Sequence, residues 1–288
     1  MAGHDPGRPP VDFFRGRTLL IATMHGKEEV IAPLLERELG VRCVTPRGYD
    51  TDRFGSFSGE VKRPDTALNT ARAKALGALA QEGGTLAVAS EGSFGPHPSY
   101  FILPADEEFV CLVDTQHDLF ITGWHLTEKT NFASRAIASL EDLEAFCAQV
   151  GYPQHRVILQ AAGRGTRAFK EYASHGELLG KAADWLGKGI DFTAETDMRA
   201  MNNPTRLAAI EAATTDLVGN ILSGCPKCRL PGFSVSDVIR GVPCGQCGFP
   251  TRSVRAHLLE CRKCGHQATR EVAHKTFEDP AHCDLCNP

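Results

Sequence analysis

The chain has 288 residues and a formal net charge of −4. This length exceeds that of one typical domain and allows a full hydrophobic core with a smaller appended module. The weak acidity provides no broad attraction to nucleic acid or anionic lipid, and no apolar run approaches the roughly 18 residues that span a bilayer. We therefore expect a cytoplasmic protein that does not span a membrane. Its polar opening, MAGHDPGRPP, predicts a disordered tail over residues 1–16.

Strands and helices alternate in the first 90 residues. RTLLIAT (17–23) predicts a buried strand, and KEEVIAPLLERELG (27–40) predicts an amphipathic helix. VRCV (41–44) is a second strand, and the Ala-rich segment at 65–84 is a second helix, followed by the strand TLAVAS (85–90). This alternation favours a sheet with parallel members and helices on its faces.

A hairpin is expected next. EFVCLVDT (108–115) and DLFITGWHLT (118–127) are two apolar runs separated by two residues, which is typical of antiparallel strands. The sheet should therefore be mixed. The fold class that follows is α/β, with a mixed sheet flanked by helices.

A second α/β portion follows the hairpin. Its expected elements are a helix over 139–151, a strand over 155–160, and helices over 175–186 and 203–222. We expect an α/β domain over residues 17–200, with room for two lobes at 17–130 and 131–200. Residues 201–222 then form a connecting helix.

The last part of the chain carries four CxxC pairs. A CxxC turn lets two thiolates bind one ion at about 2.3 Å, and two such turns complete a tetrahedral zinc site. A reducing cytosol disfavours the alternative, disulfides. The pairs therefore predict two structural Zn²⁺ ions in a double zinc-ribbon module over residues 223–288. The predicted ligands are Cys225, Cys228, Cys244, Cys247, Cys261, Cys264, Cys283 and Cys286.

The spacing of these ligands favours sequential pairing. Fifteen residues separate Cys228 from Cys244, and eighteen separate Cys264 from Cys283, and both gaps suit a zinc ribbon. We predict that the first four thiols form one site and the last four the other. A site made by the second and third pairs, thirteen residues apart, stays open.

The predicted zinc module should be structural. Four thiolates leave no open position for water, so neither ion would be catalytic. From residue 222 onward there are nine Lys or Arg and six Asp or Glu. Eight thiolates and two ions then bring the module to about −1. Phosphate contact needs clustered positive charge, so nucleic acid is disfavoured and a protein partner is favoured.

Two segments at strand ends are candidates for a small-molecule site, because ligands of open α/β sheets collect beyond the carboxyl ends of parallel strands. TMHGKEE (23–29) brings Lys27 and helix N–H groups that could hold a phosphate. SEGSFGPHP (90–98) predicts a rigid turn in which Glu91 could hold Mg²⁺ against that phosphate. The further candidate contacts are Thr23, His25, Ser90, Ser93 and His97.

At these residues the first 130 positions resemble the inosine/xanthosine triphosphate pyrophosphatases. That family has an opening Thr/Ser, Asn and Lys loop, an ENA..KA-like helix and an acidic, Gly-containing turn. Thr23 and Lys27 match the loop, NTARAKA (69–75) the helix, and Glu91 with Gly92 the turn. The match departs from the family at position 25, where a histidine stands near the expected asparagine.

The resemblance implies a Mg²⁺-dependent release of pyrophosphate from a nucleoside triphosphate. Glu91 would bind Mg²⁺, and Lys27 would bind the triphosphate. Glu60 or Asp65 would supply a second metal ligand or orient the attacking water. The whole chain also resembles an uncharacterised bacterial family with C-terminal cysteine pairs, which implies no activity.

Structural interpretations of the same residues stay open. Glu91 and Lys27 could be solvated charges, and Asp65 could cap a helix. Arg199 and Arg206 flank an Asn-Pro-Thr turn and could bind a phosphate. Alternatively, Asn203 caps a helix that starts at Pro204, which would explain the turn without function.

Together these observations favour a Mg²⁺-dependent, phosphohydrolase-like enzyme that acts on a nucleotide or a related phosphate compound and carries a structural zinc-ribbon tail. The alternative is a non-catalytic adaptor, in which the α/β domain is a scaffold and the ribbon binds protein or nucleic acid.

Overall fold

The computed structural model describes residues 10–54, 65–98, 101–162, 168–272 and 276–288. Two compact units make up this part of the chain. Gly16–Val218 forms the larger unit, and the described residues up to Arg15 join Gly219–Pro288 in the smaller one. Within the described ranges, no helix is both long enough and apolar enough to cross a membrane.

A five-stranded mixed sheet is the centre of the larger unit, which confirms the α/β fold class expected from the sequence. β1 is parallel to β2 and β3, whereas β4 and β5 add in antiparallel order. The strand order is β2-β1-β3-β4-β5. The strands are β1 (Thr18–Ala22), β2 (Arg42–Val44), β3 (Leu86–Pro96), β4 (Pro104–Asp114) and β5 (Leu119–Thr127).

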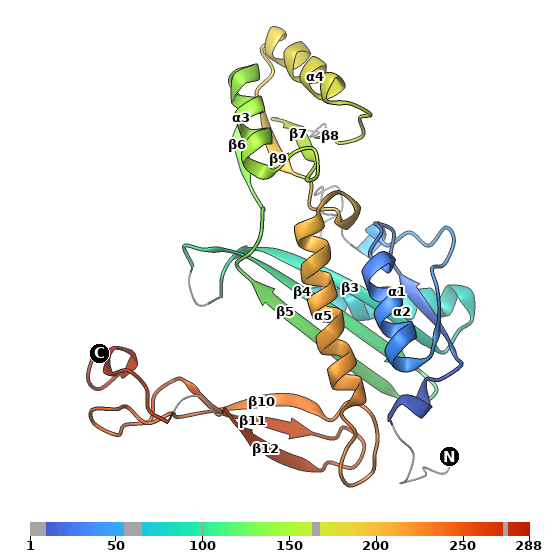
Figure 1. Ribbon diagram of the computed structural model, residues 1–288, viewed down its shortest axis with the longest axis vertical. Coiled ribbons are helices and arrows are strands. Elements are labelled where there is room, and N and C mark those ends of the chain that lie inside the picture. Colours follow the sequence, from blue (N-terminus) through green and yellow to red (C-terminus); the bar gives the residue numbers. More distant parts are fainter. Residues whose placement is uncertain (1–9, 55–64, 99–100, 163–167, 273–275) are drawn as a thin grey trace. The chain divides into compact units, whose positions relative to one another are not determined.

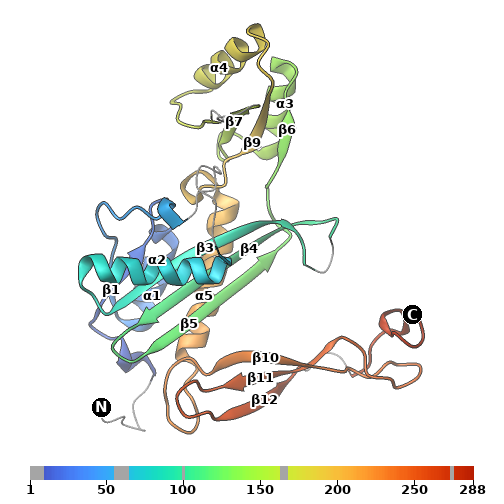
Figure 2. The same ribbon diagram turned by 180° about the vertical axis from the view of Figure 1, so that it is seen from behind.

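Helices cover both faces of this sheet. α2 (Ala67–Glu82) lies on one face, and α1 (Glu28–Leu39) and α5 (Pro204–Leu222) lie on the other (Figures 1 and 2). Small side chains let α2 approach the sheet closely, because its buried residues are mostly alanines. On the opposite face, a Cβ at Gly123 of β5 would lie 2.2 Å from the carbonyl oxygen of Ala213, so only glycine allows α5 to pack there.

β3 is longer than the sequence predicts. Residues 90–98 were expected to form a turn, but β3 runs on to Pro96 and pairs with β4 from Leu86↔Asp114 to Pro96↔Pro104. Proline is tolerated in the last position of a strand, where a missing N–H removes no interior ladder bond. Because β1 ends opposite Ala89, the second half of β3 lies beside the loop that leaves β1. The expectation of a turn is therefore wrong.

A small lobe is inserted between β5 and α5. Its sheet has the order β6-β9-β7-β8 with antiparallel pairs, and Phe146, Leu159 and Trp185 are among its buried residues. The sequence predicts both of its helices and β7 but misses the other three strands. The elements are β6 (Ser134–Ala136), α3 (Leu140–Val150), β7 (Val157–Ala161), β8 (Ala168–Phe169), α4 (His175–Gly187) and β9 (Phe192–Thr196).

The smaller unit contains a three-stranded antiparallel sheet of β10 (Ser234–Arg240), β11 (Val254–Glu260) and β12 (Gln267–Glu271). These strands are short and mostly half-buried or exposed, so they enclose little apolar surface. A module with so small a core needs cross-links or metal ions for stability.

Candidate functional site

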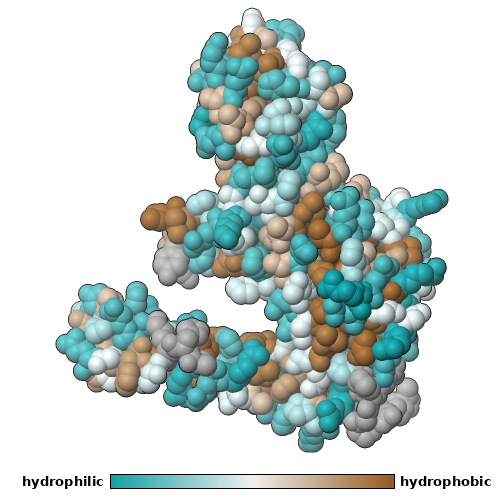
Figure 3. Space-filling view, viewed as in Figure 1, coloured by the Kyte–Doolittle hydropathy of each residue, from teal (hydrophilic) through white to brown (hydrophobic). Residues whose placement is uncertain are grey.

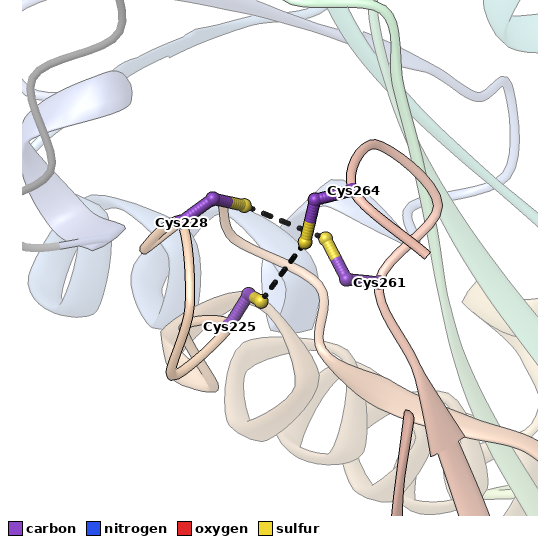
Figure 4. A group of neighbouring side chains, drawn as sticks. All are labelled: Cys225, Cys228, Cys261 and Cys264. Atoms are coloured by element: carbon purple, nitrogen blue, oxygen red, sulfur yellow. Dashed lines mark hydrogen bonds between the residues drawn. The ribbon is translucent and has the colours of Figure 1, made fainter. Parts of the chain in front are cut away.

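Four cysteines from two CxxC turns meet in the smaller unit. Cys225 and Cys228 precede β10, and Cys261 and Cys264 lie between β11 and β12 (Figure 4). The Sγ atoms of Cys225 and Cys264 are 3.7 Å apart, and those of Cys228 and Cys261 are 3.6 Å apart. A tetrahedral zinc ion with Zn–S bonds of about 2.3 Å has S–S edges of about 3.8 Å. These four thiols therefore fit a zinc ion.

The other four cysteines form a second group. The Sγ atoms of Cys244 and Cys286 are 3.9 Å apart, and those of Cys247 and Cys283 are 3.7 Å apart. Within each group all four sulfur atoms lie within 4.8 Å of one another. All these cysteines are free and form no disulfide, so each group could hold a metal ion, as in a zinc ribbon.

The sequential pairing of the cysteines expected from their spacing is wrong. The first pair joins the third, and the second joins the fourth. The sheet explains this, because Ser234↔Glu260 brings the start of β10 to the end of β11. At the opposite end, Arg240 pairs with Val254 while β12 runs back to Glu271, so residues after β10 meet residues after β12.

A second candidate site lies in the larger unit, near the carboxyl end of β1. Six charged side chains there are buried, three of them cations and three carboxylates, and we call them the charged cluster. Charged residues are almost never fully buried unless they are paired or functional. The members are Lys27, Lys74, Glu91, Asp106, Glu108 and Arg206.

One ion pair of the charged cluster lies on the α2 face of the sheet. Lys74 of α2 donates to Oε2 of Glu91 at 2.6 Å, and both side chains are almost completely buried. The backbone carbonyl of Lys74 also accepts a hydrogen bond from the hydroxyl of Tyr49 at 2.6 Å. Glu91 therefore lies in a fixed, buried ion pair and is not a solvated acid.

Another ion pair lies on the α1/α5 face. Nε of Arg206 donates to Oε1 of Glu108 at 2.7 Å, and neither side chain is exposed. Arg206 comes from the first turn of α5, which Asn203 caps by accepting from the Arg206 N–H at 3.1 Å. The helix cap at Asn203 expected from the sequence is therefore present, and Arg206 is bound to a carboxylate of the protein. Arg206 also donates to the carbonyl of Met198.

Gly92 allows this second ion pair to form. It lies opposite Glu108 in the β3–β4 ladder, and a Cβ there would lie 2.4 Å from Oε1 of Glu108. The absence of a side chain at Gly92 leaves room for the carboxylate of Glu108 to lie over β3. The glycine after Glu91 therefore serves the neighbouring carboxylate on β4.

Lys27 and Asp106 complete the charged cluster. Nζ of Lys27 donates to the carbonyl of Ser90 at 3.3 Å, at the edge of β3. Burial, followed by the charge of Arg206, lowers the pKa of Lys27 to about 7. Asp106 lies opposite Phe94 in the ladder, and burial, followed by the charge of Glu108, raises the pKa of Asp106 to about 8.

The remaining predicted contacts on this side lie in the loop after β1 and on β3. Thr23 and Ser90 are buried, and Nε2 of His25 lies 3.3 Å from Oδ1 of Asp52. The pKa of His25 is lowered, because the effect of burial exceeds the opposite effect of Asp52. A pocket of about 410 Å³ opens beside Thr23 and is also lined by Glu28 and other residues of the neighbouring loops.

Other predicted residues lie in separate networks. Asp65 is exposed and accepts hydrogen bonds from the N–H of Thr66 and the side chain of Asn69, at the start of α2. Arg199 is held by Asp197 at 2.7 Å and by Glu171. Ser93 and His97 are half-buried. Glu60 lies outside the described residues.

Sequence reasoning missed Lys74, Asp106 and Glu108. Lys74 is in the helix that matched the pyrophosphatase motif, but its partner is on a strand seventeen residues away. The run PADEEFV holds three acidic residues, and only the two-residue alternation of β4 separates Asp106 and Glu108 from Glu107 between them. That alternation was the available signal.

The fold and the cysteine groups define an α/β protein with a metal-binding tail of the zinc-ribbon type. The chain belongs to a family described as a domain of unknown function, DUF6671, whose model matches residues 74–288. The matched part includes both cysteine groups and every member of the charged cluster except Lys27. No curated protein matches the chain.

Proposed function

We propose that this protein is a divalent-cation-dependent phosphohydrolase that acts on a nucleotide or a related phosphate compound, with zinc ions stabilising its C-terminal module. The observation that carries the proposal is the charged cluster at the carboxyl end of β1. Ligands of α/β sheets bind at that position, beside the starts of helices. The cluster is built from β3, β4, α2, α5 and the residue that precedes α1, a rigid frame for a reaction.

The charges of the cluster suit a metal–phosphate substrate. Three cations and three carboxylates balance one another, so a phosphate chain and its divalent cation can enter together without leaving a large net charge buried. Lys27 and Arg206 would bind phosphate oxygens, and an anion beside Lys27 would favour its protonated form. Carboxylate oxygens are the ligands that Mg²⁺ prefers.

An aromatic pair beside the cluster supports a nucleotide as the substrate. The rings of Phe94 and Phe132 stack with centroids 5.7 Å apart, and the guanidinium of Arg206 lies 5.1 Å from the Phe94 ring. Phe132 is 45% exposed. A nucleobase could stack on Phe132 while its phosphates reach Lys27 and Arg206.

The resemblance to the inosine/xanthosine triphosphate pyrophosphatases supports attack at the α-phosphorus. The oxygen of a water molecule would bond to that phosphorus, the bond to the bridging oxygen would break, and pyrophosphate would leave while the water releases its proton. The residues that carry the resemblance include Lys27 and Glu91, both members of the charged cluster.

The test is a hydrolysis assay on the full-length, zinc-loaded protein. A panel of nucleoside triphosphates with Mg²⁺ is followed for pyrophosphate and phosphate release. Lys27→Met should lower kcat/KM by about 100-fold, because it removes a positive charge that faces the reacting phosphate. Lys188→Met, at an exposed position in the small lobe, is the matched control and should match the wild type. Absence of release from every compound by the wild type would refute the proposal.

The adaptor remains a second candidate because of one observation. Phe249, Phe277 and Leu285 are 45%, 62% and 63% exposed, and they are neighbours in sequence of the second cysteine group. Apolar and polar surface are mixed on this module (Figure 3). Exposed apolar side chains are common at protein-binding sites. An inactive wild type, together with a protein ligand whose binding Phe277→Ser abolishes, would favour the adaptor.

A further inference from the structure

Two carboxylates of the charged cluster differ from the third. Asp106 and Glu108 are two residues apart on β4, so both project from the α1/α5 face of the sheet. They are 1% and 0% exposed. Glu91 projects from the other face, where Lys74 neutralises it at 2.6 Å.

Several oxygen atoms of this pair make no hydrogen bond within the described ranges. Both carboxylate oxygens of Asp106 and Oε2 of Glu108 are buried and have no hydrogen-bond partner among the described residues. Burying a carboxylate oxygen without a hydrogen bond lowers the stability of the fold, because no new bond replaces the lost contacts with water. A group of this kind therefore indicates a ligand that supplies the missing contacts.

Two hydroxyl groups nearby share this property. Oγ of Ser90 and Oγ1 of Thr23 are buried and make no hydrogen bond within the part of the chain that the structure describes. Ser90 is two residues before Gly92, so its side chain projects from the same face as Glu108. Hydroxyl and carboxylate oxygens together form the hard donor set that Mg²⁺ and Mn²⁺ select.

We propose that Asp106 and Glu108 bind a divalent cation of the Mg²⁺ or Mn²⁺ type, and that Glu91 is a structural partner of Lys74. Asp106 and Oε2 of Glu108 supply the protein ligands, since Oε1 of Glu108 is bonded to Arg206. Mg²⁺ needs only one or two carboxylates and completes its shell with water and substrate phosphate. The role of the ion in hydrolysis rests on the proposed function, whereas its binding does not.

The neighbouring cations predict how the metal binds. Lys27 and Arg206 both interact electrostatically with Glu108, and they repel a cation that enters alone. A phosphate anion that pairs with them removes this repulsion. Metal and phosphate should therefore bind with positive cooperativity, each raising the affinity of the other by the same factor.

Binding of Mn²⁺ to the full-length, zinc-loaded protein tests this proposal. Free Mn²⁺ is measured by electron paramagnetic resonance, with and without inorganic pyrophosphate. We expect one site per chain with an affinity at least 5-fold higher when pyrophosphate is present. Asp106→Asn should weaken Mn²⁺ binding at least 10-fold. Glu107→Gln is the matched control, because Glu107 lies between the two ligands, bonds to Nε1 of Trp124 and projects from the other face.

Thermal unfolding accompanies each variant. Asp106→Asn replaces a buried carboxyl group, which makes no hydrogen bond among the described residues, with an amide of the same shape, so the variant should fold about as stably as the wild type. If it does not fold, Asp106→Ser takes its place. Unchanged Mn²⁺ binding in both Asp106 variants would overturn the metal site even if the enzyme hydrolyses nucleotides. If the Asp106 variants lose Mn²⁺ binding and the wild type hydrolyses none of the compounds, the metal site is upheld and the proposed function is refuted.

Discussion

Lys27 places an ammonium group inside the larger unit, where burial lowers its pKa to about 7. In the unfolded chain a lysine keeps its proton up to about pH 10.4. Between these two values the unfolded state binds more protons than the folded state, so stability rises with pH. Below about pH 7 both states are charged, and the destabilisation by burial is fully present.

Lys27→Met should therefore stabilise the protein most at low pH. We expect the variant to exceed the wild type in free energy of unfolding at pH 6 and the difference to shrink steadily from pH 7 to pH 10. Urea unfolding at pH 6, 8 and 10 measures it. Lys188→Met should show no such trend, and a pH-independent difference for Lys27→Met would contradict the argument.

Gly92 allows a second test at the scale of one residue. Gly92→Ala places a methyl group 2.4 Å from Oε1 of Glu108 and should destabilise the fold by about 1–3 kcal/mol. Gly95 is on the same strand, and a Cβ there has nothing within 4 Å. Gly95→Ala should change the free energy of unfolding by less than about 0.5 kcal/mol. Equal effects of the two substitutions in urea unfolding would refute the close contact.

The exposed ring of Phe132 leads to a prediction about how the base of a substrate is bound. If a nucleobase stacks on its exposed ring, Phe132→Ala should raise KM for a nucleoside triphosphate about 5-fold or more and leave kcat nearly unchanged. Inorganic tripolyphosphate lacks a base, so its hydrolysis should be insensitive to the same substitution. An equal change for both compounds would place the base elsewhere.

At the scale of elements, periodicity and capping predicted most of the helices. α3 begins after Ser139, whose side chain accepts from the N–H of Asp142, and α2 ends at Gly83 in the left-handed region, as such sequences require. The second half of β3 was not predictable in this way. Its glycines and prolines have turn propensity, and only pairing with β4, a non-local interaction, makes it a strand.

The metal ligands and the charged cluster also differ in how far local sequence signals could predict them. CxxC spacing identifies a ligand locally, so all eight cysteines could be predicted, whereas their pairing depends on the strand order of the small sheet. Lys27 follows β1, and Glu91 follows the strand predicted over 85–90, so both were found by position although β3 extends past Glu91. Asp106 and Glu108 became visible only when the register of β4 separated the residues of one face from those of the other.

The interleaved pairing has a stoichiometric consequence. Cys225→Ser with Cys261→Ser removes two ligands from one group, so we expect this variant to retain about one zinc ion per chain. Cys225→Ser with Cys244→Ser damages both groups and should lower the zinc content further. Elemental analysis of purified protein measures both. Sequential pairing would reverse the result, because Cys225→Ser with Cys244→Ser would then keep the higher zinc content, and that outcome would contradict the structure.

At the scale of the whole molecule, two units are stabilised by different means. The larger has a sheet with helices on both faces and buried apolar residues in each layer, whereas the smaller has short strands and two cysteine groups. Zinc binding supplies much of the folding free energy of such small modules.

A zinc chelator should therefore act on the smaller unit first. Amide hydrogen exchange should rise in β10, β11 and β12 once the metal is removed, and stay low in β1, β3 and β4. Mass spectrometry of exchanged peptides measures this, and adding zinc back should restore protection. Simultaneous loss of protection in both units would show that they unfold together.

Glu108 and Arg206 are 98 residues apart in the sequence. During translation the strand that carries Asp106 and Glu108 leaves the ribosome well before the helix that supplies the guanidinium. Until α5 has been made, these carboxylates and the apolar residues beside them, Val110 and Leu112, cannot be enclosed. The order of synthesis therefore decides when this part of the nascent protein becomes protease-resistant, and a chain that stops before Pro204 would stay vulnerable to degradation.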